Sequence, residues 1–213
     1  MPVSAVIFDF NGTLSDDEPL LCELFMHLFA EHGRPMSAQE YFDQLAGLSD
    51  PEIVKTWLGE DHPDVEAVIG ERVRRYREAA ADGSTVHDHV REAVRYAAER
   101  APLAICSGAA RDEIEPVVKA AGIAGCFRAI VTSDDVIHGK PDPEGYVKAL
   151  ALLGAGPAQA VVFEDTEAGV ASARAAGVGR VLAVRTTLDA HRLAGADELL
   201  DRIDVDVIRR LLL

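Results

Sequence analysis

The stretch Val6-Ile7-Phe8-Asp9-Phe10-Asn11-Gly12-Thr13-Leu14 decides the fold that this chain is expected to adopt. It begins inside an apolar run, residues 3–8, that is typical of a buried strand in a parallel sheet. The run ends at a carboxylate, Asp9, and the turn signal Asn11-Gly12 follows it. Ligands of open α/β sheets bind beyond the carboxyl ends of the strands, so Asp9 is a candidate functional residue. Taken alone, it could equally be a turn residue or a helix cap.

Composition places the chain among ordinary globular proteins. Its 213 residues suffice for one large domain or two smaller ones, and 48% of them are hydrophobic. We find neither an apolar stretch of membrane-spanning length nor a signal-peptide pattern. The three cysteines, Cys22, Cys106 and Cys126, lack metal-like spacing. An odd number of cysteines without an export signal favours a reducing cytosol, so we expect a cytoplasmic protein.

The net charge restricts the class of partner. A formal charge of −15 argues against nucleic acid and against an anionic membrane surface. The same charge opposes the binding of any anionic substrate. A phosphate site in this chain must therefore be locally positive, through a metal ion, a lysine and backbone N–H groups.

Residues 16–84 are expected to form helices and no strand. Apolar residues recur at helical spacing from Leu20 to Phe29. Further helices are expected to follow caps at Ser37 and at Ser49 or Asp50, and to run from about residue 63 to 81. A purely helical insert between two strands indicates a separate small cap. Its two crossings, near residues 15–17 and 82–84, are the expected hinge.

From Val86 onward the sequence alternates between helix and strand patterns. The expected strands are residues 103–106, 129–131, 160–163 and 181–184. The expected helices are residues 88–100, 111–121, 143–153, 167–176 and 205–213. This alternation predicts a parallel sheet with helices on both faces. The α/β core would comprise residues 1–15 and 85–213, on either side of the helical insert.

Chemically useful groups follow the predicted strands. Ser107-Gly108 follows the second strand, Lys140 lies after the third, and Glu164-Asp165 ends the fourth. The fold would bring these groups to Asp9, since the carboxyl ends of parallel strands share one edge. A carboxylate such as Asp9 can attack phosphorus, and Mg²⁺ prefers carboxylate oxygens. Lys140 and Ser107 could then hold the remaining phosphate oxygens.

Each group also has an ordinary structural explanation. Ser107 alone is a common loop residue, and Lys140 alone is a typical solvated lysine. Glu164-Asp165 could cap the helix that follows, and Arg111 could simply pair with Glu115 four residues later. The occurrence of four such groups in this order, each after its own strand, favours an enzyme site.

The motifs Asp9-Phe10-Asn11-Gly12-Thr13, Ser107-Gly108, Lys140-Pro141 and Glu164-Asp165 resemble the four motifs of the haloacid dehalogenase-like hydrolase superfamily. The stretch 139–146 is especially similar to its β-phosphoglucomutase/phosphoglycolate phosphatase branch. The resemblance spans nearly the whole chain. It implies a Rossmann-like core with a helical cap, Mg²⁺ dependence and a phospho-aspartate on Asp9.

The resemblance also implies roles for individual residues. The catalytic residues would be Asp9, Asn11, Thr13, Ser107 and Lys140. The substrate-binding residues would be Gly12, Gly47, Gly108 and Arg111. The metal ligands would be Asp9, Asn11 through its backbone carbonyl, Glu164 and Asp165.

Among the activities of this branch, a phosphatase for a small phosphorylated metabolite fits best. Dehalogenases lack the Glu164-Asp165 pair. Phosphomutases carry a lysine and an arginine where this chain has Ala46 and Asp50, and the cap lysine Lys55 does not match the phosphonate hydrolases. The loop around Gly47 is expected to set specificity. The alternatives are a phosphomutase, a phosphonate hydrolase, or a catalytically impaired phosphate- or Mg²⁺-binding protein. We expect a monomer or a weak homodimer.

Asn11 departs from the family pattern, in which an Asp protonates the leaving group and then activates water. An amide cannot exchange that proton. General acid–base catalysis contributes about 10²–10⁴-fold, or roughly 3–5 kcal/mol of barrier. The resemblance therefore predicts a slow enzyme that an Asp at position 11 would accelerate, unless Glu18 or another cap residue supplies the proton.

Overall fold

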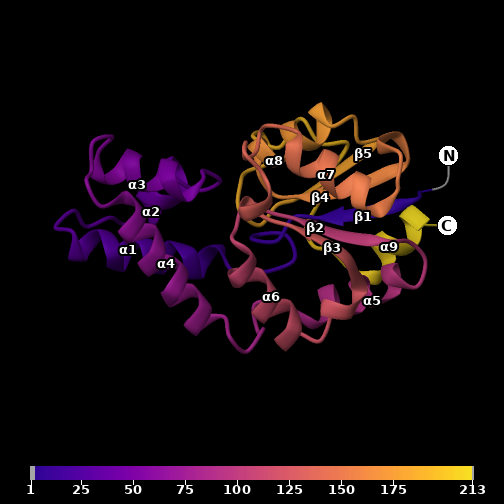
Figure 1. Cartoon of the computed structure of the whole chain (residues 1–213), viewed down its shortest axis with the longest axis horizontal. Coiled ribbons are helices and arrows are strands. Elements are labelled where there is room, and N and C mark those ends of the chain that lie inside the picture. The colour runs from indigo at the N-terminus through magenta and orange to yellow at the C-terminus, as the bar shows by residue number, and fades with distance from the viewer. Residues whose placement is uncertain (1–2, 213) are drawn as a thin grey trace.

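The computed structural model describes residues 3–212 as an α/β fold in which a group of helices lies beside a parallel sheet (Figure 1). Within these residues the sheet has the order β3-β2-β1-β4-β5-β6, and all neighbouring strands run parallel. The strands are β1 (Ala5–Phe8), β2 (Leu103–Cys106), β3 (Phe127–Val131), β4 (Ala160–Glu164), β5 (Arg180–Val184) and β6 (Glu198–Leu200). The chain runs from β1 to one side of the sheet and later crosses to the other. The carboxyl end of β1 therefore lies at the switch point where such sheets bind ligands.

Helices cover both faces of the sheet, as predicted. They are α5 (Asp88–Ala98), α6 (Arg111–Ala120), α7 (Glu144–Leu153), α8 (Glu167–Ala175) and α9 (Val205–Leu212). Side chains alternate along β1, so Val6 and Phe8 pack with α5, α6 and α9, whereas Ala5 and Ile7 pack with α7 and α8. Among residues 3–212, no helix combines the length and the apolar character needed to cross a membrane.

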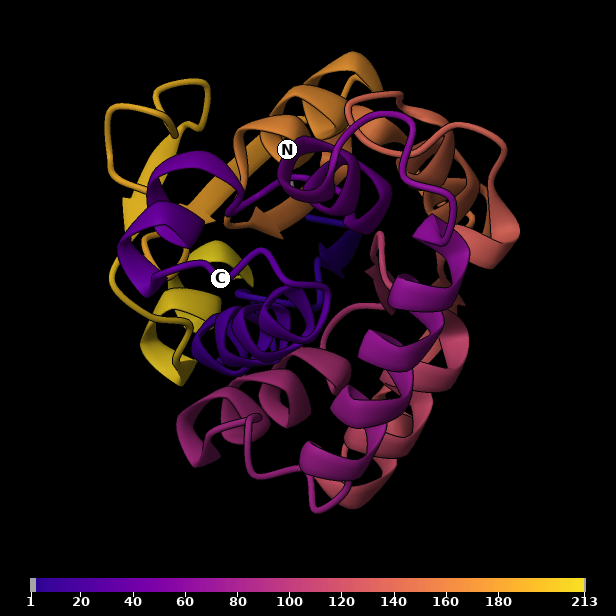
Figure 2. The ribbon, with the colours of Figure 1, turned by 90° about the vertical axis from the view of Figure 1, so that its left-hand side faces the viewer.

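Four helices form the insert between β1 and β2. They are α1 (Glu18–Glu31), α2 (Ala38–Gln44), α3 (Asp50–Leu58) and α4 (Val65–Ala79). Capping boxes start two of them, Ser37 with Glu40 at α2 and Ser49 with Glu52 at α3. Helix α4 packs on α1 and α3 and also contacts α6 of the core. Viewed from the insert side, these helices lie in front of the sheet (Figure 2).

The sequence prediction differs from the structure in a few places. The first strand begins at Ala5 rather than at residue 3, and Leu213, the last residue of the predicted tail helix, lies outside the described residues. The edge strand β6 was not predicted. It is three residues long, begins with the charged Glu198, and pairs along one side only, with β5. Such a strand has too little apolar pattern to be recognised.

The aromatic contact between β1 and β4 should be a major source of stability. Phe8 is fully buried, and its ring stacks on Phe163 with the ring centroids 5.0 Å apart. We expect Phe8→Ala to lower the free energy of unfolding by about 3–5 kcal/mol, through lost contacts and a cavity. Urea unfolding measures this. Leu152→Ala, at a side chain 58% exposed, is the control and should change stability by less than about 0.5 kcal/mol. Equal effects of the two substitutions would contradict the assignment.

Candidate active site

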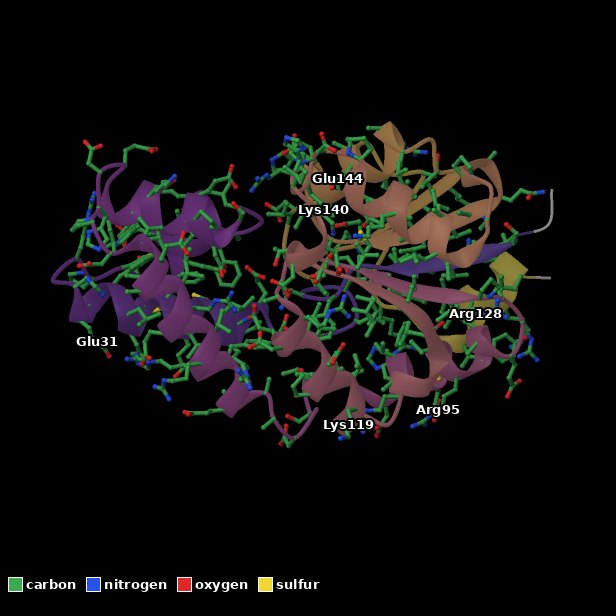
Figure 3. The ribbon with its side chains drawn as sticks, viewed as in Figure 1. Glu31, Arg95, Lys119, Arg128, Lys140 and Glu144 are labelled. Atoms are coloured by element: carbon green, nitrogen blue, oxygen red, sulfur yellow. The ribbon has the colours of Figure 1, made fainter. Side chains whose placement is uncertain are left out.

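Loops at the carboxyl end of the sheet bring the predicted site residues together. Asp9 directly follows β1, Ser107 follows β2 and Asp165 follows β4. The Asp9 N–H donates to the carbonyl of Phe163 over 2.9 Å, which continues the strand pairing and fixes the position of the carboxylate. Lys140 comes from the loop before α7, at the end of the core nearest the insert (Figure 3).

Three buried carboxylates and one lysine form the centre of the site. Asp9, Glu164 and Asp165 each place an oxygen within 4.8 Å of the others. The Lys140 Nζ donates to Asp9 Oδ1 and to Glu164 Oε1, at 2.5 Å each. Tyr146 donates its hydroxyl to the same Glu164 oxygen over 2.6 Å. Buried charges are costly unless they are paired, so Lys140 makes this cluster tolerable.

Glu164 is held on both of its oxygens. Its Oε2 accepts the Asp165 N–H over 3.1 Å and the Thr166 hydroxyl over 3.1 Å. Gly169 leaves room for this carboxylate, because a Cβ at that position would lie 1.9 Å from Glu164 Oε1. These contacts position Lys140 and the start of α8. Direct metal ligation by Glu164, expected from the sequence, stays a prediction.

Asp165 is oriented by two hydroxyl groups. Thr13 donates to its Oδ1 over 3.2 Å, and Thr187 donates to its Oδ2 over 2.5 Å. Gly12 has a φ of +67°, and a Cβ there would lie 2.0 Å from Asp165 Oδ2, so glycine is required. The Thr186 hydroxyl donates to the Gly12 carbonyl. Sequence reasoning missed Thr186 and Thr187, because ordinary threonines after β5 carry no signal of their own.

The Asn11 side chain points to a carboxylate that the sequence analysis did not assign to the site. The Asn11 Nδ2 donates to Asp17 Oδ2 over 2.9 Å. Asp17 also accepts the Gly12 N–H over 3.1 Å and the Tyr76 hydroxyl over 2.5 Å. The sequence marked residues 15–17 as a crossing between segments. The link to Tyr76, far along the chain, could not be read from it.

The loop after β2 places Ser107 and Gly108 where the motif predicts them. Ser107 is buried, and Gly108 is exposed at the turn. The Ser107 Oγ accepts the Ala109 N–H over 3.1 Å, so the hydroxyl folds back onto its own loop. The Ala110 N–H is held by Glu113 over 3.1 Å at the start of α6. The loop is thereby fixed at both ends.

Arg111 is engaged by the core. Its guanidinium pairs with Glu115 at 3.1 Å and with Asp135 at 2.6 Å, and it donates to the Ile130 carbonyl over 3.0 Å. The pairing with Glu115 is the structural alternative that the sequence left open. These contacts hold the Arg111 side chain against the core, and its expected role in substrate binding stays a prediction.

The loop around Gly47 lies against the core beside the site. Gly47 has a φ of +85°, and a Cβ there would lie 3.4 Å from Leu188 and 3.5 Å from Thr166. Thr166 is next to Asp165 in the chain. The insert loop that was expected to set specificity therefore touches the loops after β4 and β5, which border the acidic centre.

Arg72 connects the insert to the core through its buried ion pair with Glu113. Its guanidinium pairs with Asp50 at the start of α3 and with Glu113 at the start of α6. Arg72 and Glu113 are buried. Because Glu113 also holds the Ala110 N–H, helix α4 is linked to the loop that carries Ser107.

Electrostatics leave the centre short of positive charge. Burial raises the pKa of Asp9 to about 7, against the opposing effect of Lys140. The pKa of Asp165 is raised well above its usual range by burial and by the charges of Asp9 and Glu164. Burial alone would lower the pKa of Lys140, but the two facing carboxylates reverse this and raise it. One lysine thus faces more carboxylate charge than it can neutralise, an arrangement that a divalent cation would relieve.

The donor set fits a hard cation. Asp9 and Asp165 offer carboxylate oxygens, which suit Mg²⁺. The hydrogen bonds from Thr13 and Thr187 fix the orientation of Asp165, as groups around metal ligands commonly do. The carbonyl of Asn11 belongs to the same loop as Asp9.

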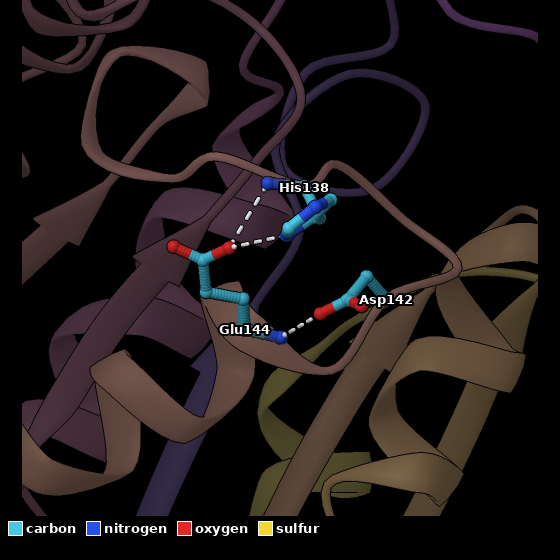
Figure 4. A group of neighbouring side chains, drawn as sticks. All are labelled: His138, Asp142 and Glu144. Atoms are coloured by element: carbon cyan, nitrogen blue, oxygen red, sulfur yellow. Dashed lines mark hydrogen bonds and ion pairs between the residues drawn. The ribbon is translucent and has the colours of Figure 1, made fainter.

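A second group of possible ligand atoms, formed by His138, Asp142 and Glu144, has a structural role (Figure 4). Glu144 accepts the N–H groups of Ile137 and His138 at 3.0 and 2.9 Å. Asp142 in turn accepts the Glu144 N–H over 2.9 Å. The group shapes the loop that presents Lys140.

Glu18, the alternative proton donor, is buried in the insert. Its Oε1 accepts the Tyr41 hydroxyl over 2.9 Å. Burial raises its pKa to about 7, although the bond from Tyr41 opposes the shift.

Comparison with known proteins identifies the family. Residues 6–184 match the haloacid dehalogenase-like hydrolase family. The chain is 32% identical to validoxylamine A 7'-phosphate phosphatase of Streptomyces hygroscopicus subsp. limoneus, with 91% of each chain covered. It is 31% identical to N-acetylmuramic acid 6-phosphate phosphatase of Pseudomonas aeruginosa, covering 100% of this chain and 97% of that protein. A crystal structure of CbbY from Rhodobacter sphaeroides, an Asp-to-Asn mutant in complex with xylulose-(1,5)bisphosphate, superposes with a TM-score of 0.80 at 27% identity, covering 94% of this chain and 95% of that one.

The family match runs from residue 6 to residue 184, a range that contains the four strand-end groups. The match extends over most of the chain, including the helical insert. The chain therefore belongs to the haloacid dehalogenase-like hydrolases, in their β-phosphoglucomutase/phosphoglycolate phosphatase-like branch.

Proposed function

We propose that this chain is a Mg²⁺-dependent phosphatase that acts on a small phosphorylated metabolite through a phospho-aspartate on Asp9. The observation that carries the proposal is the buried centre in which Lys140 joins Asp9 and Glu164 beside Asp165. The names of the two relatives, both phosphatases of phosphorylated small molecules, support it.

The reaction has two steps. In the first, an Asp9 carboxylate oxygen attacks phosphorus while the bond between phosphorus and the leaving oxygen breaks, and that oxygen takes a proton. In the second, water attacks the phosphorus, loses a proton, and releases inorganic phosphate and the Asp9 carboxylate. Lys140 and the Ser107 loop hold the charged phosphate oxygens in both steps.

Asp9, Asp165 and the Asn11 backbone carbonyl would hold the Mg²⁺. When bound, the ion supplies positive charge to the phosphate oxygens and to the nucleophile. We assign Glu164 the task of positioning Lys140, since its Oε1 accepts the Lys140 ammonium.

Residues 16–84 serve as the cap, and residues 1–15 and 85–213 serve as the core. A groove of about 450 Å³ runs between α2 and the loop after β5. It includes Gln39 and Phe42 on one side and Thr187 on the other, next to Asp165. The groove reaches the acidic centre only at Thr187, and closure of the cap over that centre would exclude water from the phosphorylated Asp9. The polar lining favours a hydroxylated substrate, and we expect a cytoplasmic monomer or weak homodimer.

The rival activities of the branch gain little support. Lys55 lies exposed on α3, which does not suit an imine-forming lysine buried in a substrate site. Asp50 stands where the phosphomutases carry an arginine, and it already pairs with the nearby cation Arg72. A second phosphate would therefore meet no free positive charge at this position. A catalytically impaired phosphate-binding protein stays the second candidate, because Asn11 removes the acid–base carboxylate.

The first prediction tests the reaction itself. With an aryl phosphate as substrate, we expect hydrolysis that requires Mg²⁺ and stops with a chelator. Asp9→Asn preserves the side-chain shape and removes the nucleophile, so activity should fall by at least about 10³-fold. The matched control is Asp88→Asn, at a carboxylate 92% exposed, which should keep full activity. Hydrolysis that survives in Asp9→Asn would sink the proposed mechanism.

The second prediction concerns pH and metal affinity. Mg²⁺ must displace any proton on Asp9, whose pKa is raised to about 7 in the folded protein. Below that pKa the carboxyl is protonated and affinity falls. Between pH 8 and pH 6 the apparent Kd for Mg²⁺ should therefore rise about tenfold. Calorimetric titration at the two pH values measures this, and a Kd independent of pH would count against Asp9 as a ligand.

The third prediction concerns the order of rates. Without a general base at position 11, water should attack the phospho-aspartate slowly, while a good leaving group still departs readily. A rapid-quench experiment should show a burst of about one phenol per chain, and two aryl phosphates with unlike leaving groups should share one steady-state turnover. Turnover that tracks the leaving group, with no burst, would show that the first step limits the reaction.

A further inference from the structure

Asp17 is the acceptor at the centre of a buried hydrogen-bond cluster. It is fully buried, and its two oxygens receive three donors. Oδ1 accepts the Gly12 N–H, and Oδ2 accepts both the Asn11 amide and the Tyr76 hydroxyl. Two of these donors lie in the loop that follows Asp9. The third lies on helix α4 of the cap.

The chemistry of the cluster requires a donor at position 11. Burial raises the pKa of Asp17, and the hydrogen bonds from Tyr76, Gly12 and Asn11 oppose this shift by favouring the ionised form. That form is an acceptor only, so each of these neighbours must donate to it. The Asn11 amide does so over 2.9 Å. An Asp in its place would have nearly the same shape but would turn a carboxylate oxygen toward Asp17. A half-buried acceptor at position 11 would then face the buried Asp17, which carries a like charge, and this is unfavourable.

We propose that Asp17 is a positioning residue that fixes the side chain at position 11, and that Asn11 is matched to it as its hydrogen-bond donor. This inference rests on the proposed phosphatase function for its catalytic consequence, but not for the pairing itself. The residues at 11 and 17 then act as a unit. Asp at position 11 alone is therefore not expected to restore fast turnover; a matching change at position 17 is needed as well.

The same carboxylate links the catalytic loop to the cap. Tyr76 is fully buried and reaches Asp17 from α4. A side chain at position 11 that repels Asp17 would therefore also disturb the contact that positions helix α4 of the cap. Catalytic loss in such a variant would come from misplacement as well as from repulsion.

Exchange of the two residues should recover the cluster. An amide at position 17 can keep its oxygen on the Gly12 N–H, where Asp17 Oδ1 now accepts, and can turn its nitrogen toward position 11. A carboxylate at position 11 would then accept from that nitrogen. The Tyr76 hydroxyl can serve as donor or acceptor, so it fits either arrangement.

The test is a double-mutant cycle on stability, with the full-length chain. Asn11→Asp alone should lower the Tm by roughly 4–10 °C. The double variant Asn11→Asp/Asp17→Asn should return to within about 2 °C of the parent. The control, Asp16→Asn, changes the neighbouring carboxylate, which is 48% exposed and bonded to His87, and should not rescue Asn11→Asp. Equal stability of parent and Asn11→Asp, or a double variant no better than the single one, would overturn the pairing.

Kinetics separate positioning from a merely structural role. With an alkyl phosphate and Mg²⁺, the double variant should exceed the parent in kcat by at least about tenfold with KM within about twofold. Asn11→Asp alone should fall clearly below the double variant. A double variant that is stable but no faster than Asn11→Asp would overturn the positioning role. If no variant hydrolyses any phosphate ester, the proposed function fails, and the stability cycle still decides the pairing.

Discussion

The Lys140 ammonium, held between Asp9 and Glu164, is the contact on which the site depends. It crosses from the loop before α7 to the ends of β1 and β4, so three parts of the core must meet correctly for it to form. Removing one partner of a buried ion pair commonly costs about 3–5 kcal/mol, because the other charge is left unpaired. Glu144 accepts two N–H groups of the loop that carries Lys140 and thereby helps to position this lysine. The predicted nucleophile, Asp9, and its counter-charge, Lys140, are thereby held in place without a substrate.

Helix α4 connects the insert to the loops that surround this site. Arg72 and Tyr76 are four residues apart and so lie on one face of the helix. Arg72 reaches Glu113, which holds the loop after β2, and Tyr76 reaches Asp17, which holds the loop after β1. One helix face is therefore bonded to the supports of both loops. A movement of α4 would therefore displace the supports of both the predicted nucleophile loop and the predicted phosphate loop.

The sequence alone predicted those parts of the fold and of the site that depend on local residue patterns. Apolar runs that end in Asp9, Ser107 and Glu164 predicted both the parallel strands and the edge where they meet, because parallel topology leaves little freedom in where strand ends lie. Contacts that depend on tertiary packing were out of reach. Thr187 and Tyr76 have no local mark that distinguishes them from other residues of their kind, and only the folded chain brings each to a carboxylate. Arg111 is held by Glu115 and Asp135, contacts that the sequence pattern after a site motif does not specify, and its role in substrate binding stays a prediction.

The amide at position 11 is best understood through the charge of its surroundings. Five buried carboxyl groups lie in or next to the site, at Asp9, Asp17, Glu18, Glu164 and Asp165. Lys140 is bonded to two of them, Asp9 and Glu164, and a divalent cation bound by the proposed ligands would neutralise charge on Asp9 and Asp165. Asp17 is served by neutral donors alone, from Asn11, Gly12 and Tyr76. A further carboxylate at position 11 would remove a donor from Asp17 and add a negative charge in one change. The lack of a general acid at position 11 lowers the rate by about 10²–10⁴-fold. An Asp at position 11 would instead destabilise the loop that carries Asp9. With Asp17 in place, the structure favours the amide.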